Sequence, residues 1–170
     1  MSEAERLAGN LRAVRARIAA AARAAGRDPG AVALLAVSKT HPAEAVAALA
    51  ALGQRDFAEN RVQELSGKAA ALADDPAVPA LRWHLVGQLQ RNKAAAVVRL
   101  GATVHSVDRE QLVQALARAA ETQQCVVDVL VQVDLGGPGA SWGSGAGPRP
   151  TTSPGWPTPS VRPPACGCAA

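Results

Sequence analysis

Short apolar runs alternate with amphipathic stretches from Val32 to Asp134, and this alternation limits the folds open to the chain. The runs predict strands at residues 32–38, 56–59, 81–86, 103–107 and 126–134. The stretches between them, together with residues 4–25, carry the three- and four-residue apolar spacing of helices. Strands that alternate with helices in this way form a parallel sheet with right-handed crossovers. The sequence therefore predicts an α/β fold.

Single residues mark the expected ends of the helices. Gly26, Gly53 and Gly101 follow the helical stretches 4–25, 43–52 and 91–100 and are expected to end them. Asp108 is expected to cap the helix at residues 109–123, because an aspartate side chain accepts hydrogen bonds from the free amides of a first turn. A further helix is expected at residues 61–73.

A closed barrel is favoured over an open sheet. No Gly-x-Gly-x-x-Gly segment follows any predicted strand, so a dinucleotide-binding sheet would lack its fingerprint. A complete (β/α) barrel has eight strands and about 250 residues, whereas only five strands are predicted here. We expect residues 1–134 to form an incomplete TIM-type (β/α) barrel.

The last part of the chain has a different composition. Residues 135–170 contain eight Gly, eight Pro and no Asp, Glu or Lys. Such a segment buries too little apolar surface to offset its ordering entropy, so we expect a disordered tail. Two origins remain open: a reading-frame shift near Gly136 that replaced the second half of the barrel, or a genuine disordered extension.

Composition argues against several functions. The net charge is only +4, and Phe57 and Trp83 are the only aromatic residues among the first 134, so nucleic-acid binding is not indicated. The polar start and the lack of any long apolar segment predict a cytoplasmic location without membrane contact. Cys125, Cys166 and Cys168 suggest neither a disulfide framework nor a metal site.

Lys39 is the main candidate for chemistry, because it directly follows the apolar run at residues 32–38. A run of this kind is typical of a strand buried on both faces of a parallel sheet. Ligands of such folds collect at the C-terminal ends of the strands, where the loops converge. A lysine fixed there can attack a carbonyl group and form a Schiff base. The alternative is a solvated lysine that only closes the strand.

Three motifs resemble the pyridoxal phosphate homeostasis protein family. They are Leu-Leu-Ala-Val-Ser-Lys-Thr at residues 34–40, Phe-Ala-Glu-Asn-Arg-Val-Gln-Glu at 57–64 and Trp-His-Leu-Val-Gly-Gln-Leu-Gln-Arg-Asn-Lys at 83–93. The resemblance extends over residues 5–134 and implies the N-terminal part of an alanine-racemase-like barrel. It also implies pyridoxal 5′-phosphate held as a Schiff base on Lys39, without an established catalytic activity.

The resemblance further implies a role in controlling the free level of this cofactor, with PLP-dependent apoenzymes as candidate recipients. It adds Asn60 and His84 to the cofactor-binding residues. The residues themselves leave alternatives: Asn60 could cap the following helix, and His84 could be a satisfied core histidine of a strand. Gly87 is expected to permit a tight turn after that strand.

The second half of the barrel, which in the family contributes phosphate and ring-nitrogen contacts, has no counterpart after Asp134. We therefore expect cofactor binding to be impaired. A PLP-dependent racemase or decarboxylase is the alternative function, although the second acid/base residue that it needs is not visible. A non-functional fragment is the other alternative.

Overall fold

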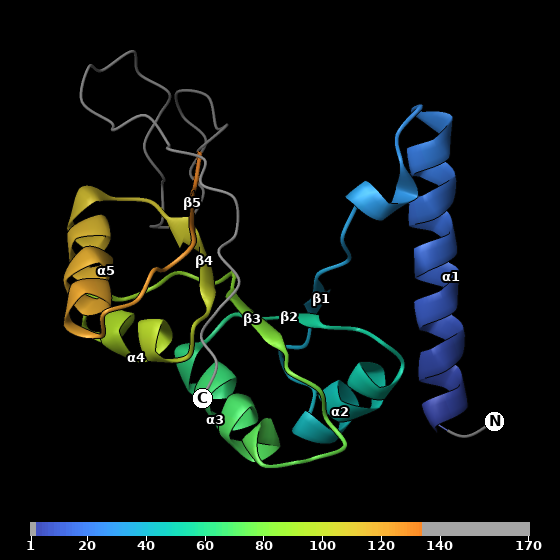
Figure 1. Cartoon of the computed structure of the whole chain (residues 1–170), viewed down its shortest axis with the longest axis horizontal. Helices are drawn as coiled ribbons and strands as arrows, with labels where there is room; N and C mark the ends of the chain where they lie inside the picture. The colour runs from blue at the N-terminus through green and yellow to red at the C-terminus, as the bar shows by residue number, and fades with distance from the viewer. Residues whose placement is uncertain (1–2, 134–170) are drawn as a thin grey trace.

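Five parallel strands form one sheet in this computed structural model, which describes residues 3–133. Their order in the sheet follows the chain, β1-β2-β3-β4-β5 (Figure 1). The strands are β1 (Ala36–Val37), β2 (Asp56–Glu59), β3 (Arg82–Leu85), β4 (Thr103–Val107) and β5 (Val129–Val131). This architecture confirms the expected α/β fold, a partial barrel of five strands.

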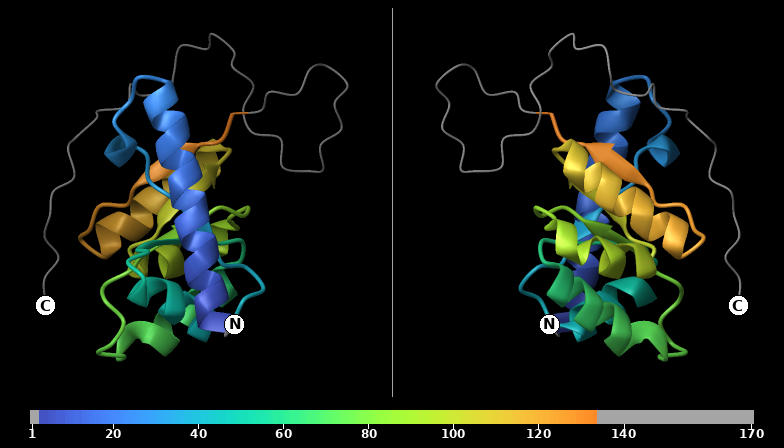
Figure 2. Two further views of the ribbon diagram at one scale, coloured as in Figure 1. Left: turned by 90° about the vertical axis from the view of Figure 1, so that its right-hand side faces the viewer. Right: turned by 90° about the vertical axis from the view of Figure 1, so that its left-hand side faces the viewer.

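Helices lie before β1 and between successive strands. They are α1 (Glu3–Ala24), α2 (Ala43–Ala51), α3 (Val62–Ala73), α4 (Ala94–Arg99) and α5 (Glu110–Thr122), with the short 3-10 helices η1 (Pro29–Ala31) and η2 (Arg91–Lys93). Helix α1 and the short helix η1 precede β1, and the other helices connect successive strands. Helices α2 to α5 follow one another along one side of the sheet, and each contacts the next (Figures 1 and 2). Helix α1 packs against α2, and Arg15 of α1 donates a hydrogen bond to Gly53 O, just before β2.

The hydrophobic core lies between the sheet and helices α2 to α5. Phe57, Leu85 and Val104 of the strands are fully buried there, against Leu65 of α3 and Leu112 of α5. Alternate strand residues point the other way, to a face that these helices do not cover, which we call the open face. Val37 on this face is 49% exposed.

The prediction of a strand at residues 32–38 that is buried on both faces is wrong in the length of the strand and in its burial. Only Ala36 and Val37 belong to β1, and neither is fully buried. Among the described strands β1 pairs with β2 alone, so it lies at an edge and its open-face side chain has no covering layer. The expected strand at residues 126–134 is likewise reduced to β5, in which all three residues are exposed.

The expected cap at Asp108 is also wrong. The N-cap residue of α5 is Arg109, and no side chain caps this helix. Asp108 instead accepts a hydrogen bond from Arg109 Nη1, while Arg109 Nη2 donates to Leu89 O. The ion pair therefore takes the carboxylate that the helix amides would have used.

Other boundaries follow the sequence closely. Gly26, Gly53 and Gly101 each adopt a positive φ directly after a helix, as helix-ending glycines do. The expected helix at residues 91–100 is divided into η2 and α4.

The expected disorder of residues 135–170 lies outside the described residues. None of the helices described is both long enough and apolar enough to cross a lipid bilayer.

Candidate functional site

Lys39 lies in the turn between β1 and α2, at the C-terminal edge of the sheet. The turn is closed by a hydrogen bond from His41 N to Ser38 O, and Thr40 adopts a positive φ of 66°. The Lys39 side chain is exposed, and its amine has no hydrogen bond or ion pair with any residue from 3 to 133. The amine is therefore free to meet a ligand.

Buried side chains of β2 and α3 hold the backbone on the N-terminal side of Lys39. Lys68 Nζ donates to Ser38 O at 2.7 Å and to Glu59 Oε1 at 2.5 Å. Ser38 Oγ donates to the same Glu59 oxygen at 2.7 Å. The side chains of Glu59 and Lys68 are 0% and 10% exposed. We call Ser38, Glu59 and Lys68 the anchor network, because it fixes the residue before Lys39.

A second contact restrains the other side of the turn. The backbone amide of Thr40 donates to Glu64 Oε2 at 3.4 Å, a longer and weaker bond than those of the anchor network. Both neighbours of Lys39 are thus tied to the segment that follows β2, while Lys39 itself projects without a partner. This is a fixed backbone that carries a free amine.

Asn60 follows β2 directly, and its side chain is exposed. The alternative of a helix cap is not found, since Arg61 is the N-cap residue of α3 and no side-chain bond caps the helix. Gly87 packs against the backbone of Asn60 so closely that a Cβ atom on Gly87 would lie 2.0 Å from Asn60 O. Close packing, and not a positive φ, is therefore what requires a glycine at position 87.

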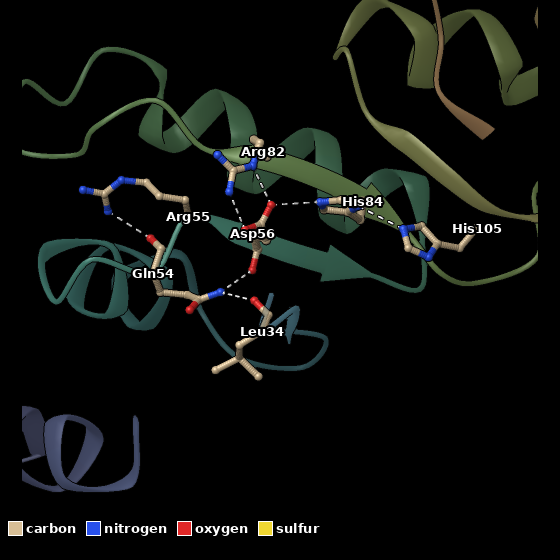
Figure 3. Close-up of polar contacts among 7 residues, drawn as sticks. All are labelled: Leu34, Gln54, Arg55, Asp56, Arg82, His84 and His105. Atoms are coloured by element: carbon tan, nitrogen blue, oxygen red, sulfur yellow. Dashed lines mark hydrogen bonds and ion pairs between the residues drawn. The ribbon is translucent and has the colours of Figure 1, made fainter. Parts of the chain in front are cut away.

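His84 belongs to a row of polar side chains on the open face (Figure 3). Arg82 donates two hydrogen bonds to Asp56, from Nε and Nη2, each at 2.6 Å. Asp56 Oδ1 lies 3.4 Å from His84 Nε2, and His84 Nδ1 lies 2.9 Å from His105 Nε2. We call Asp56, His84 and His105 the histidine relay. The His84 side chain is 17% exposed and has polar contacts at both ring nitrogens.

Charges in the relay shift two pKa values. The Arg82 guanidinium beside Asp56 holds the pKa of that carboxyl below its ordinary value; burial opposes this shift and His84 adds to it. Burial, followed by the neighbouring His84, lowers the pKa of His105. At neutral pH the relay therefore contains an ionised Asp56 and a neutral His105.

The strand registers arrange the open-face residues in two rows. A lower row is defined by direct pairing and consists of Val37, Ala58, His84 and Thr103. Two residues later in the sequence an upper row follows at the C-terminal edge: Lys39, Asn60 and Val86 lie just past the ends of β1, β2 and β3, and His105 lies within β4. The structure thus brings Lys39 and Asn60 to one level of the sheet and places His84 one level below them.

Sequence reasoning missed several residues of this site. Glu59 and Lys68 of the anchor network, and Asp56 and His105 of the relay, were not among the predicted site residues. The sequence signals for them were the place of Glu59 in the motif at residues 57–64 and the place of His105 in the predicted strand at residues 103–107. Within residues 3–133, no group of three His, Cys, Asp or Glu side chains is arranged to hold a metal ion.

Comparison with known proteins identifies relatives of this chain. Residues 9–138 match the family model described as alanine racemase, N-terminal domain. The pyridoxal phosphate homeostasis protein of Pseudomonas aeruginosa is 47% identical over 131 residues, covering 77% of this chain and 55% of the relative. That of Mycobacterium leprae is 43% identical over 138 residues, covering 75% of this chain and 54% of the relative. The chain spans about half the length of the curated relatives it matches.

Two solved structures share the fold. PipY of Synechococcus elongatus, whose structure has pyridoxal phosphate bound, superposes with a TM-score of 0.60 at 43% identity and covers 71% of this chain and 55% of PipY. An unknown protein from Bifidobacterium adolescentis superposes with a TM-score of 0.71 at 33% identity, over 84% of this chain and 61% of that protein. The chain therefore belongs to the alanine racemase N-terminal domain family and, within it, to the family of the pyridoxal phosphate homeostasis proteins.

Proposed function

We propose that this chain binds pyridoxal 5′-phosphate as a Schiff base on Lys39 and takes part in the intracellular homeostasis of this cofactor. The observation that carries the proposal is the free amine of Lys39 on a backbone held by the anchor network. The bound cofactor of PipY and the homeostasis proteins among the relatives support the same assignment.

The residues present fit the cofactor. When bound, pyridoxal phosphate supplies an electrophilic aldehyde, and Lys39 supplies the nucleophilic amine. Asn60 offers an exposed amide at the same level of the sheet. It also lines a neighbouring pocket of about 510 Å³, whose lining residues include neither Lys39 nor His84. His84 offers an imidazole on the same face. We propose Lys39, Asn60 and His84 as cofactor-binding residues.

The chain contains only three lysines, which makes the choice of Lys39 testable. Lys68 is buried, and its side-chain nitrogen donates hydrogen bonds to Glu59 and to Ser38 O, so it is already engaged within the fold. Lys93 follows β3 and lies in the wall of the pocket near Asn60. The two other lysines therefore serve as internal controls for the reactivity of Lys39.

We further propose that this chain alone retains the cofactor weakly. Complete barrels commonly bind phosphate in the loops after strands seven and eight. The chain spans about half the length of its curated relatives, and the described strands number five. Phosphate contacts of that kind would therefore be missing, and the covalent bond to Lys39 would carry most of the affinity.

Borohydride trapping tests the assignment. The full chain is incubated with pyridoxal phosphate, reduced, digested and analysed by mass spectrometry. We expect the adduct on the peptide that contains Lys39, little on those with Lys68 or Lys93, and loss of the main adduct in Lys39→Ala. A dominant adduct on another lysine would refute the proposal. An imine absorbance band that survives desalting and disappears in Lys39→Ala would refute weak retention alone.

We do not assign a catalytic activity to the chain; cofactor carriage, with PLP-dependent apoenzymes as recipients, is the role proposed. An amino-acid racemase is the competing function, and the family model that matches residues 9–138 gives it a specific basis. Turnover of L-amino acids to their D-forms by the chain with added cofactor, absent in Lys39→Ala, would favour the racemase.

A further inference from the structure

The histidine relay connects the two rows of the open face in one direction. Asp56 is the first residue of β2, His84 lies in the lower row, and His105 lies in the upper row with Lys39 and Asn60. Each step of the relay crosses to the next strand and rises by two residues, as diagonal neighbours on parallel strands do. Figure 3 shows the relay from Asp56 through His84 to His105. The relay therefore leads from the start of β2 towards the C-terminal edge of the sheet, where Lys39 lies.

We propose that His105 is a ligand-binding residue whose Nδ1 accepts a hydrogen bond from the bound cofactor. His84 and Asp56 are positioning residues that fix His105 in the tautomer with a free lone pair on Nδ1. His105 is not among the cofactor-binding residues Lys39, Asn60 and His84. The inference rests on the proposed function and deepens it. His84 then serves the cofactor through His105.

The hydrogen bonds determine which nitrogen of each ring carries a proton. Arg82 donates twice to Asp56, so the Asp56 carboxylate is ionised and can only accept. His84 Nε2, 3.4 Å from Asp56 Oδ1, is consequently a protonated nitrogen of the His84 ring. In the relay His84 Nδ1 then accepts the bond at 2.9 Å from His105 Nε2. A neutral His105 that donates from Nε2 has its lone pair on Nδ1.

The surroundings keep His105 neutral. Burial and the neighbouring His84 both lower the pKa of His105. The negative charge of Asp56 is paired with Arg82. A neutral imidazole with a free lone pair at the ligand-binding edge is suited to accept a hydrogen bond from an N–H or O–H group of a ligand.

This position selects the part of the ligand that His105 would contact. Three strand spacings separate β1 from β4, about 14 Å along the sheet, so His105 cannot touch Lys39 directly. It would meet a ligand joined to Lys39 at the end remote from that bond. The ligand must offer a donor there, and in pyridoxal phosphate this would be the protonated ring nitrogen, which lies opposite the carbon that carries the aldehyde.

Nitrogen NMR of the histidine rings tests the tautomer without any cofactor. In the full chain at neutral pH we expect His105 to carry its proton on Nε2 and His84 on Nε2. In His84→Ala we expect the pKa of His105 to rise, because one of the two causes that lower it is removed. A proton on Nδ1 of His105, or an unchanged pKa in His84→Ala, would overturn the relay.

Borohydride trapping at Lys39 tests the contact with the cofactor. Loss of one hydrogen bond to the ligand should lower the adduct yield of His105→Gln about tenfold at subsaturating cofactor. Thr103→Val alters the same strand and face one level lower and serves as the control, with a yield expected to match the unaltered chain. Circular dichroism establishes that both variants are folded; should His105→Gln fail to fold, His105→Leu, which has no acceptor, replaces it.

The two failures can be told apart. Equal yields from the folded His105 variant and the unaltered chain would overturn the role of His105 while the proposed function stands. No adduct at Lys39 in the unaltered chain would overturn the proposed function and, with it, the cofactor as the ligand of His105. The NMR result would then still decide whether His84 and His105 carry their protons on the nitrogens that the relay requires.

Discussion

Gly87 lies where only a residue without a side chain fits. We expect Gly87→Ala to destabilise the chain by about 2 kcal/mol, because its Cβ would lie 2.0 Å from Asn60 O and would force two backbone segments apart. The free energy of unfolding in urea measures this change.

Gly67→Ala provides the control for that experiment. Gly67 lies within α3, and a Cβ atom there would meet nothing within 4 Å. Alanine is favoured over glycine in a helix, so we expect Gly67→Ala to stabilise the chain by up to about 1 kcal/mol. Equal stability of the two variants would show that the contact between Gly87 and Asn60 is not restrictive.

Asp56 should make the thermal stability of the chain depend on pH in the acidic range. Its pKa in the folded chain is below the ordinary value of 3.8, mainly because of Arg82. The stabilisation is therefore complete above the unfolded-state pKa and is lost as pH falls through the folded-state pKa. We expect Asp56→Asn to lower the thermal midpoint at neutral pH, and this difference should shrink as the pH falls below 3.8.

Melting curves recorded by circular dichroism over the acidic range test the role of Asp56. Asp128→Asn is the matched control, because Asp128 is exposed and its side chain has no hydrogen bond or ion pair within residues 3–133. A difference between Asp56→Asn and the unaltered chain that stays constant with pH would contradict the prediction.

Residue positions at strand ends could be predicted, but contacts between strands could not. Lys39 and Asn60 follow apolar runs, and the rule for parallel sheets places such residues at one edge. His105 was missed because its contact with His84 depends on the register between β3 and β4. This register brings His105 Nε2 to 2.9 Å from His84 Nδ1. Lys68 was missed because a charged residue in a helical stretch is normally read as exposed.

Two buried charges maintain the connection between β1, β2 and α3. Removal of one partner of a buried ion pair leaves the other charge without compensation, which costs about 3–5 kcal/mol. We therefore expect Lys68→Met to destabilise the chain by about this amount, since it isolates the fully buried Glu59. Urea unfolding measures the loss.

The double variant Glu59→Gln with Lys68→Met tests whether the ion pair is the cause. The double variant removes both charges, and the amide oxygen that replaces the Glu59 carboxylate can still accept the hydrogen bond from Ser38 Oγ. We expect it to be more stable than Lys68→Met alone by about 1–3 kcal/mol. Additive losses from the two single substitutions would contradict a direct coupling between Glu59 and Lys68.

The predicted elements differ from the observed ones mainly at the sheet edges. The strands at residues 56–59 and 103–107 were predicted with their observed bounds, because each is flanked on both sides within the sheet and its apolar pattern reflects real burial. The runs at residues 32–38 and 126–134 were read as longer strands than β1 and β5. Apolar composition does not reveal whether a strand has a neighbouring strand on both sides. A strand with a neighbour on one side only forms fewer hydrogen bonds between strands, so it ends early.

Within residues 3–133, the sheet has two edges and an open face, and apolar side chains are exposed on β1 and β5. Val129, Leu130 and Val131 of β5 are 42%, 47% and 47% exposed, and Val37 of β1 is 49% exposed. Unpaired strand edges and exposed apolar surface favour association with other chains. We therefore expect marginal stability and self-association that increases with protein concentration.

Sedimentation velocity over a range of concentrations measures this association. Leu130→Lys places a charge in the exposed edge strand, which should oppose edge pairing and shift the population towards monomer. Val113→Lys adds the same charge to an exposed position of α5, outside the sheet, and should leave the association unchanged because no strand edge is altered. A monomer with a cooperative thermal transition at high concentration would contradict the expectation, since it would mean that the open face and both edges are stable in water.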